Sequence, residues 1–223
     1  MALSLHQKAT SHFPPTIRSI WVSIAVGSIG FIGIFLCVHY NVLIATLDLP
    51  VHDWFFSQRN AILTPIMLFI TDLLSPTTFA VIVLLGAGGW ALYKKELWRP
   101  LLLIGAMALT MIVSTGIKML AHRVRPPVDQ MVIPHELDFS FPSGHTIGVA
   151  VALFVVAYLI YSRARVHLFA WTFVITVSVL LIAITRLYLG YHWLTDVSAS
   201  VFLAFIILGT VMAIDRLKPA RFS

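Results

Sequence analysis

Residues 197–214 read VSASVFLAFIILGTVMAI, a stretch of the chain without a single charged side chain. At a rise of about 1.5 Å per residue, an α-helix of this length, with its polar flanks at the interface, crosses a hydrocarbon core of about 30 Å. Backbone N–H and C=O groups inside a bilayer must be bonded within the segment, so the stretch is predicted to be a transmembrane helix.

Five further apolar runs resemble this one in length and lack of charge. They lie at residues 20–38, 77–93, 100–117, 146–161 and 168–184. The whole chain has 223 residues, of which 59% are hydrophobic and only 11% charged, against about 25% charged residues in a soluble domain. Both a soluble globule and a disordered chain are therefore excluded. The sequence predicts an all-α polytopic membrane protein, a six-transmembrane-helix bundle formed by residues 20–214 as one domain.

The segments around these runs complete the predicted organisation. Residues 1–19 form a polar N-terminal segment before a first run read as a retained signal anchor, and residues 215–223 form a C-terminal tail. Residues 61–75 carry apolar side chains at helical spacing, but they include Asp72 and are too short to span a bilayer. They are predicted to form an additional interfacial helix. The single cysteine, Cys37, cannot form an intramolecular disulfide.

Basic residues are unevenly distributed over the loops, and this asymmetry predicts the orientation. One side of the predicted bundle holds Lys8, Arg18, Lys94, Lys95, Arg99, Arg163, Arg165, Arg216, Lys218 and Arg221. That side is predicted to be the cytoplasm, with both termini on it, in a multi-pass protein of the cytoplasmic membrane. If residues 61–75 crossed the bilayer, only the N-terminal part would change sides.

Three polar segments lie at helix ends on the opposite, extracytoplasmic face. They are residues 118–126 (KMLAHRVRP), 141–145 (FPSGH) and 185–196 (TRLYLGYHWLTD). Because successive helices run antiparallel, these segments emerge on one face and can meet in one pocket. The net charge of +6 is then explained by membrane lipids and a phosphate-bearing substrate, with no nucleic acid as partner.

The residue types in these segments suit phosphoryl chemistry. Lys118, Arg125 and Arg186 only donate hydrogen bonds, and two guanidinium groups can grip phosphate oxygens bidentately. The N–H groups at Ser143 and Gly144 open a helix and form a potential anion site.

The remaining polar residues suit acid–base and nucleophilic roles. Asp196 follows His192 by four residues, so its carboxylate can hold one imidazole nitrogen while the other attacks. His145 arrives from another helix and can protonate a leaving alkoxide.

Each feature has a simpler interpretation when it is taken alone. Lysines and arginines at helix ends, including Lys118 and Arg123, are commonly interfacial anchors, and Pro-Ser-Gly is commonly a turn. We assign structural roles to His39, His52, His135 and His167. Three polar segments on one face, with ionisable groups near membrane depth where they are costly, together indicate a functional site.

The pattern Lys118-x6-Arg125-Pro126, Pro142-Ser143-Gly144-His145 and Arg186-x5-His192-x3-Asp196 resembles the three-part motif of the type 2 phosphatidic acid phosphatase superfamily. The similarity covers the second half of the chain, and Thr185 stands where the family pattern has serine.

The resemblance implies catalytic roles for His192 as nucleophile, for Asp196 as the residue that orients it, and for His145 as general acid and then base. It also implies phosphate binding by Lys118, Arg125, Ser143, Gly144 and Arg186. The cations would take the place of a metal, so no metal site and no cofactor are expected.

The predicted function is metal-independent hydrolysis of a lipid phosphate or diphosphate through a phosphohistidine intermediate. Undecaprenyl diphosphate, phosphatidylglycerol phosphate and phosphatidate are the candidate substrates by resemblance. A lipid phosphotransferase would use the same histidine, and an anion transporter is the alternative from another class. The loop from Pro127 to Phe141 is predicted to determine specificity, because it must lie over the pocket.

Overall fold

The structure is a computed structural model that describes residues 15–133, 138–164 and 168–217. In these residues the chain folds into α-helices joined by short connections, with no β-strand. The helices are α1 (Ile17–His39), α2 (Leu49–Ser57), α3 (Leu63–Leu73), α4 (Pro76–Lys94), α5 (Trp98–Ala121), α6 (Gly144–Ala164), α7 (Leu168–Tyr188) and α8 (Leu194–Arg216). A π-helical turn, Ile44–Asp48, precedes α2, and a 3-10 turn, Val128–Gln130, follows α5.

The predicted six-transmembrane-helix bundle is confirmed. Within the described residues, α1, α4, α5, α6, α7 and α8 are long and apolar enough to cross a membrane. Each contains one of the predicted apolar runs and extends it by a few residues. The extensions matter for function, because they carry Lys118 within α5 and Arg186 within α7.

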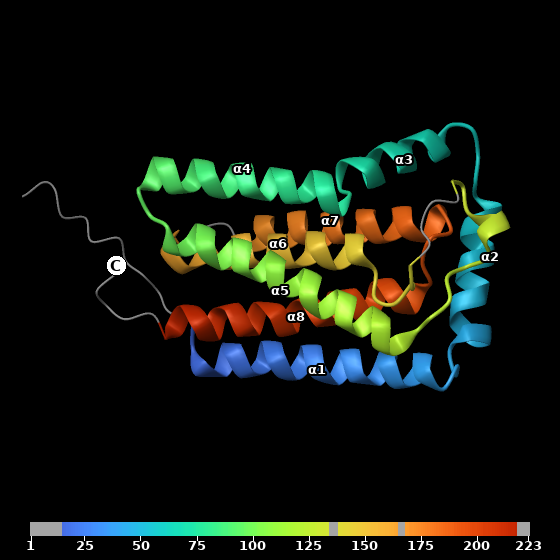
Figure 1. Ribbon diagram of the computed structural model, residues 1–223, viewed down its shortest axis with the longest axis horizontal. Coiled ribbons are helices and arrows are strands. Elements are labelled where there is room, and N and C mark those ends of the chain that lie inside the picture. Colours follow the sequence, from blue (N-terminus) through green and yellow to red (C-terminus); the bar gives the residue numbers. More distant parts are fainter. Residues whose placement is uncertain (1–14, 134–137, 165–167, 218–223) are drawn as a thin grey trace, which may run out of the picture.

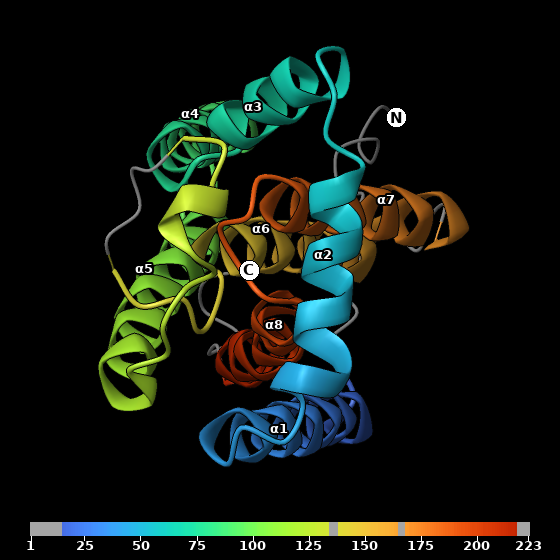
Figure 2. The same ribbon diagram turned by 90° about the vertical axis from the view of Figure 1, so that its right-hand side faces the viewer.

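Helices α6 and α8 occupy the centre of the bundle, and the other spanning helices surround them (Figures 1 and 2). Helix α1 packs closely along α8. A Cβ atom at Gly27 would lie 2.7 Å from the backbone oxygen of Phe202, so a glycine is needed where the two backbones approach. The Ser23 hydroxyl donates across the same interface to the Phe205 carbonyl over 2.7 Å.

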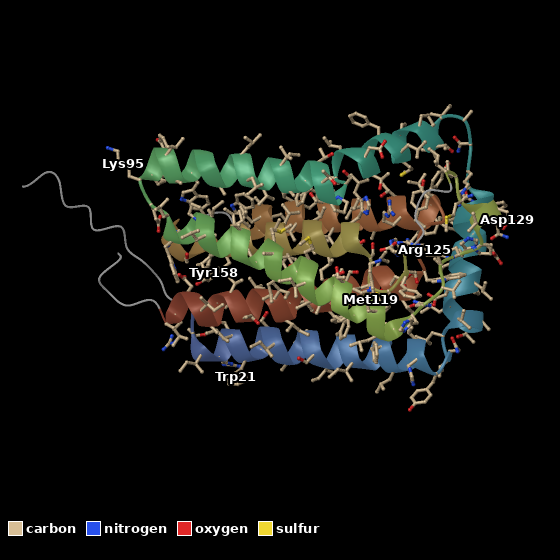
Figure 3. The ribbon with its side chains drawn as sticks, in the orientation of Figure 1. Trp21, Lys95, Met119, Arg125, Asp129 and Tyr158 are labelled. Atoms are coloured by element: carbon tan, nitrogen blue, oxygen red, sulfur yellow. The ribbon has the colours of Figure 1, made fainter. Side chains whose placement is uncertain are left out.

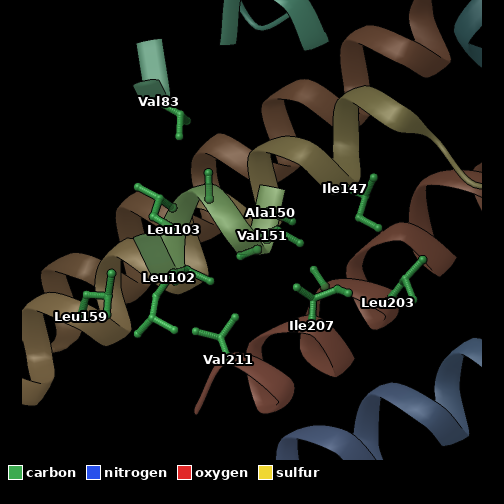
Figure 4. Close-up of a cluster of buried hydrophobic side chains, with 14 of the residues drawn as sticks. Val83, Leu102, Leu103, Ile147, Ala150, Val151, Leu159, Leu203, Ile207 and Val211 are labelled. Carbon is green, nitrogen blue, oxygen red and sulfur yellow. The ribbon is translucent and has the colours of Figure 1, made fainter. Parts of the chain in front are cut away.

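A buried apolar cluster joins α4, α5, α6 and α8 in the middle of the bundle (Figure 4). Its most buried members include Val151 and Leu159 of α6 and Leu203 and Ile207 of α8. This packing fixes the relative positions of the helices whose ends carry the polar segments.

Helix α2 was not predicted from the sequence. It begins at Leu49-Pro50 and lies across one end of the bundle (Figure 2). Its nine residues include polar side chains such as His52 and Asp53. The segment therefore contains no long apolar run from which a helix could have been predicted. Helix α3 confirms a short helix within residues 61–75, and its position at the membrane interface stays a prediction.

The two ends of the spanning region meet at the end of the bundle away from α2. Arg216 Nη1, at the end of α8, donates to the Pro15 carbonyl before α1 over 2.7 Å. Lys95 also lies at this end, whereas Arg125 and Asp129 lie at the other (Figure 3). The start of α1 and the end of α8 therefore share one side, as an even number of spans requires. The flanking residues 1–14 and 218–223 lie outside the described part of the chain.

Candidate active site

The three polar segments of the sequence meet at the α2 end of the bundle. The Trp193 indole N–H donates to the Val124 carbonyl over 2.9 Å, which joins the first segment to the third. The Ser200 hydroxyl of α8 lies 3.1 Å from the carbonyl oxygen of Ser143 and 2.8 Å from that of Asp196. These bonds hold the start of α6 against the first turn of α8.

A tight turn after α7 brings the third segment into place. Gly190 has a φ of 77°, and a Cβ atom there would lie 2.7 Å from the Gln130 carbonyl oxygen. Only glycine fits both the backbone conformation and the close approach. The turn directs His192 toward the ends of α5 and α6.

His192 lies between a carboxylate and a guanidinium group. Its Nδ1 is 3.4 Å from Asp196 Oδ2, and its Nε2 is 3.2 Å from Arg125 Nη1. Because an arginine can only donate, the Nε2 atom must accept, and the ring proton lies on Nδ1 facing Asp196. The backbone N–H of Trp193 holds the same carboxylate oxygen over 2.9 Å. This tautomer leaves the lone pair on Nε2, the nitrogen that faces the cationic group.

Lys118 and Arg125 share one acidic partner. Asp138 Oδ2 forms an ion pair with Lys118 Nζ at a distance of 2.8 Å, and Asp138 Oδ1 contacts Arg125 Nη2. Partial burial acts to raise the pKa of Asp138, but hydrogen bonds and charge from Lys118 and Arg125 outweigh it and lower the pKa to about 2. Asp138 is therefore an anion beside two cations that could also hold a phosphate. Sequence reasoning placed it only in the specificity loop.

A cavity of about 770 Å³ extends from these residues between α4, α5 and α6. Its polar end is formed by Lys118, Arg125, Asp138, Gly144, His145 and His192. The rest is mainly apolar, with Phe79, Val83, Ile104, Met107, Met111 and Ile147 among its lining residues. The cavity thus has one charged end and a long apolar part, so it is complementary to an amphiphilic molecule.

Five of the eight predicted site residues line this cavity: Lys118, Arg125, Gly144, His145 and His192. The other three are fully or almost fully buried behind it. The Ser143 hydroxyl accepts from the Thr146 N–H over 3.4 Å and so caps the start of α6. Arg186 donates to the Thr71 hydroxyl of α3 over 2.8 Å and stacks 4.4 Å from the Tyr191 ring centre. The phosphate contacts expected of Ser143 and Arg186, and the role of Asp196 in orienting His192, stay predictions.

Two charged residues behind Asp196 were missed as site residues. Arg123, read from the sequence as an anchor, donates to Asp196 Oδ1 and to Asp48 Oδ2, each over 2.5 Å. Asp48 lies in the π-helical turn before α2 and is 1% exposed. The one signal in the sequence was an unpaired carboxylate among apolar residues, which is costly near a membrane unless it has a partner.

The chain is similar to known proteins over much of its length. Residues 99–218 match the sequence model of the PAP2 superfamily. The chain is 31% identical over 168 residues to phosphatidylglycerophosphatase B of Bacillus subtilis (strain 168), covering 74% of this chain and 80% of that protein. It is 30% identical over 155 residues to undecaprenyl-diphosphatase BcrC of the same organism, covering 68% and 74%.

A solved structure is also similar. The crystal structure of a transmembrane PAP2 type phosphatidylglycerolphosphate phosphatase from Bacillus subtilis superposes with a TM-score of 0.79 and 26% identity, covering 89% of this chain and 99% of that chain.

Proposed function

The chain belongs to the PAP2 superfamily as a lipid phosphate phosphatase, and we propose that it cleaves its substrate in two steps through a phosphohistidine on His192. One observation carries the proposal. His192 presents an unprotonated Nε2 at the charged end of an otherwise apolar cavity, while its Nδ1 faces the buried carboxylate of Asp196.

In the first step, the Nε2 lone pair attacks phosphorus and the bond from phosphorus to the lipid oxygen breaks. His145, on the cavity wall, gives its proton to that departing oxygen. Asp196 stabilises the positive charge that the imidazole acquires when it bonds to phosphorus. In the second step, His145 takes a proton from water, the water oxygen attacks phosphorus, and the P–N bond breaks to return the electron pair to Nε2.

Lys118 and Arg125 supply positive charge where negative charge spreads over the phosphoryl oxygens. Such preorganised donors act mainly on the transition state and account for a large part of phosphoryl-transfer catalysis. Gly144 adds a backbone N–H donor at the start of α6. Arg186 and Ser143 would hold this arrangement from behind or reach the phosphate after a side-chain shift.

The cavity supports a substrate with a long apolar tail. Leu84, Met111 and Met119 line the cavity and are 54%, 69% and 58% exposed, which indicates an opening at this part of its wall. The cavity thus opens sideways between α4 and α5, where a lipid can enter from the bilayer with its phosphate directed to Arg125. Phosphatidylglycerol phosphate, undecaprenyl diphosphate and phosphatidate are the proposed substrates.

We place the site on the extracytoplasmic face of the cytoplasmic membrane. Lys94, Lys95 and Arg216 lie at the opposite end of the bundle, which is the end expected in the cytoplasm. In a Cys37→Ser background, Asp129→Cys should react with an impermeant thiol reagent in intact cells and Lys95→Cys should not. The reverse labelling pattern would refute this orientation.

The test of the reaction is phosphate release from purified protein on the three candidate lipids, with and without a chelator. We expect activity that survives chelation, and an acid-labile, base-stable phosphate trapped on the protein and missing from His192→Ala. Adding lipid or sugar alcohols separates hydrolysis from phosphotransfer, since a transferase would form a new phosphate ester in place of inorganic phosphate. A well-folded His192→Ala protein that still turns over a phosphate ester would contradict the mechanism.

A further inference from the structure

We propose that Arg123 and Asp48 are positioning residues that act on the nucleophile through Asp196, by fixing its carboxylate and preserving its negative charge. The inference rests on the proposed role of His192. Arg123 stands at one of the unspecified positions between Lys118 and Arg125 of the first motif, and Asp48 lies far from all three motifs in the sequence.

The four residues form a continuous chain of contacts. His192 Nδ1 faces Asp196 Oδ2 at 3.4 Å, and the other oxygen, Oδ1, accepts from Arg123 Nη1. The second nitrogen, Arg123 Nη2, donates to Asp48 Oδ2. One guanidinium therefore bridges two carboxylates, and the other Asp196 oxygen, Oδ2, faces His192 and also accepts from the Trp193 N–H.

Backbone and hydroxyl donors fix Asp48 independently of Arg123. The Thr195 N–H donates to Asp48 Oδ1 over 2.9 Å, and the Thr195 hydroxyl donates to Oδ2 over 2.8 Å. These donors lie in the first turn of α8, where the helix dipole favours an anion. A residue 147 positions earlier in the chain thus holds the turn that carries Asp196.

Burial makes the charge balance of this chain important. The exposed fractions of the side chains are 1% for Asp48, 9% for Arg123 and 0% for Asp196. Arg123 and Asp196 alone would be a neutral pair, and the carboxylate would do little for a histidine that becomes cationic. Asp48 adds one negative charge, so the buried group keeps a net charge of −1 facing His192.

Other charged or titratable groups around His192 are arranged differently. Arg125, with Lys118 and Asp138 beyond it, lies on the Nε2 side. His145 comes from α6, Arg186 from α7, and His52 of α2 packs against Trp193 with ring centres 5.5 Å apart.

Two single variants move the charge of the buried group in opposite directions. Asp48→Asn changes it from −1 to zero, and Arg123→Gln changes it from −1 to −2. His192 must be unprotonated to attack, so kcat/KM falls at low pH as His192 becomes protonated. The midpoint of this acidic limb should move to lower pH in Asp48→Asn and to higher pH in Arg123→Gln, by about 0.5 pH unit or more. The double variant returns the charge to −1, so its limb should return toward that of the wild type.

The rates give a second readout. We expect kcat to fall about tenfold or more in each single variant, with KM for a lipid phosphate changed much less, because the network touches the nucleophile and not the substrate. Arg123→Lys keeps the charge but cannot bridge two carboxylates as a planar fork. It should lower kcat without moving the limb.

Asp72→Asn is the matched control, since Asp72 lies exposed on α3, outside the proposed site, and its substitution makes the same change in total charge as Asp48→Asn. Its limb and kcat should equal those of the wild type. If Asp48→Asn does not fold in detergent, Arg123→Gln and Arg123→Lys carry the test by themselves. Limbs that stay in place, or that move in the same direction in both single variants, would overturn the proposal.

Trapping of phosphohistidine on the wild-type protein distinguishes this failure from failure of the proposed function. A trapped intermediate with unmoved limbs refutes only the role of Asp48 and Arg123. Absence of the intermediate refutes the nucleophile itself.

Discussion

Arg125 Nη1 lies 3.2 Å from His192 Nε2, so the guanidinium faces the nitrogen that is proposed to attack phosphorus. Arg125 also donates to the carbonyl oxygens of Tyr191 over 2.7 Å and Asp138 over 2.8 Å. These bonds fix the plane of the guanidinium relative to the imidazole. The arginine is therefore positioned to bring a phosphate group against Nε2.

We predict that Arg125→Lys lowers kcat/KM for a lipid phosphate by about 100-fold. Lysine keeps the positive charge but loses the planar fork that holds both the backbone carbonyls and a phosphate. Steady-state kinetics in detergent micelles measures the effect. Arg216→Lys, at the opposite end of the bundle, is the control and should retain full activity, whereas similar activity in both variants would make Arg125 an interfacial anchor.

We predict that Asp138→Asn strengthens inhibition by inorganic phosphate several-fold. In this structure the Asp138 carboxylate occupies donors of Lys118 and Arg125 that a phosphate would need. Asparagine still accepts hydrogen bonds but carries no competing charge. Because the pKa of Asp138 is about 2, its carboxylate is charged at both pH 6 and pH 8, so the variant should bind phosphate more tightly than the wild type at both. Unchanged or weaker inhibition would show that Asp138 does not compete with phosphate.

Asp138 should also make stability depend on pH in a defined window. Its pKa is lowered in the folded protein, so its stabilising contribution is fully present above the ordinary carboxyl pKa of about 4. It is lost as the pH falls toward about 2. The difference in melting temperature between wild type and Asp138→Asn should be constant above about pH 5 and should shrink at lower pH. A difference that grows on acidification would contradict the ion pairs with Lys118 and Arg125.

A bulky side chain inside the cavity should lower the turnover of long-chain lipid phosphates more than that of short substrates. Gly148 lines the cavity on α6, with Met107 Cε 4.0 Å from the position of an added Cβ. We predict that Gly148→Phe lowers kcat/KM for a long-chain lipid phosphate about tenfold or more and leaves a short, water-soluble phosphate ester nearly unaffected. Gly89→Phe, on an exposed part of α4 with open space around it, is the control. Equal losses on both substrates would mean that the cavity does not hold the lipid tail.

The two histidines should differ in their dependence on the leaving group. His192→Ala should abolish turnover of every substrate, because no phosphoenzyme can form. His145→Ala should lose about 10²–10⁴-fold on a lipid phosphate but much less on an aryl phosphate, whose leaving group needs little protonation. Single-turnover rates on both substrate types measure the difference. Equal losses for His145→Ala on both substrates would remove its role as general acid.

Much of the architecture could be predicted from local sequence. The length of an apolar run and its lack of charge are properties of one segment, and they are enough to predict a spanning helix such as α8. The three polar segments could likewise be assigned to one face, because antiparallel order follows from the number of spans between them. His192 and Asp196 belong to one short segment, and their spacing of four residues was enough to predict that the imidazole ring and the carboxylate lie together.

The tertiary structure decided which residues act together across long distances in the sequence. Asp48 meets Thr195 and Arg123 only because α2 crosses the end of the bundle, and no local pattern specifies that crossing. Packing likewise directs Arg186 to Thr71 and turns Asp138 toward Lys118. The apolar cavity exists only because α4, α5 and α6 leave space between them. Local hydrophobicity fixes what each segment becomes, whereas contacts between distant segments depend on side-chain packing and charge pairing that exist only once the helices have assembled.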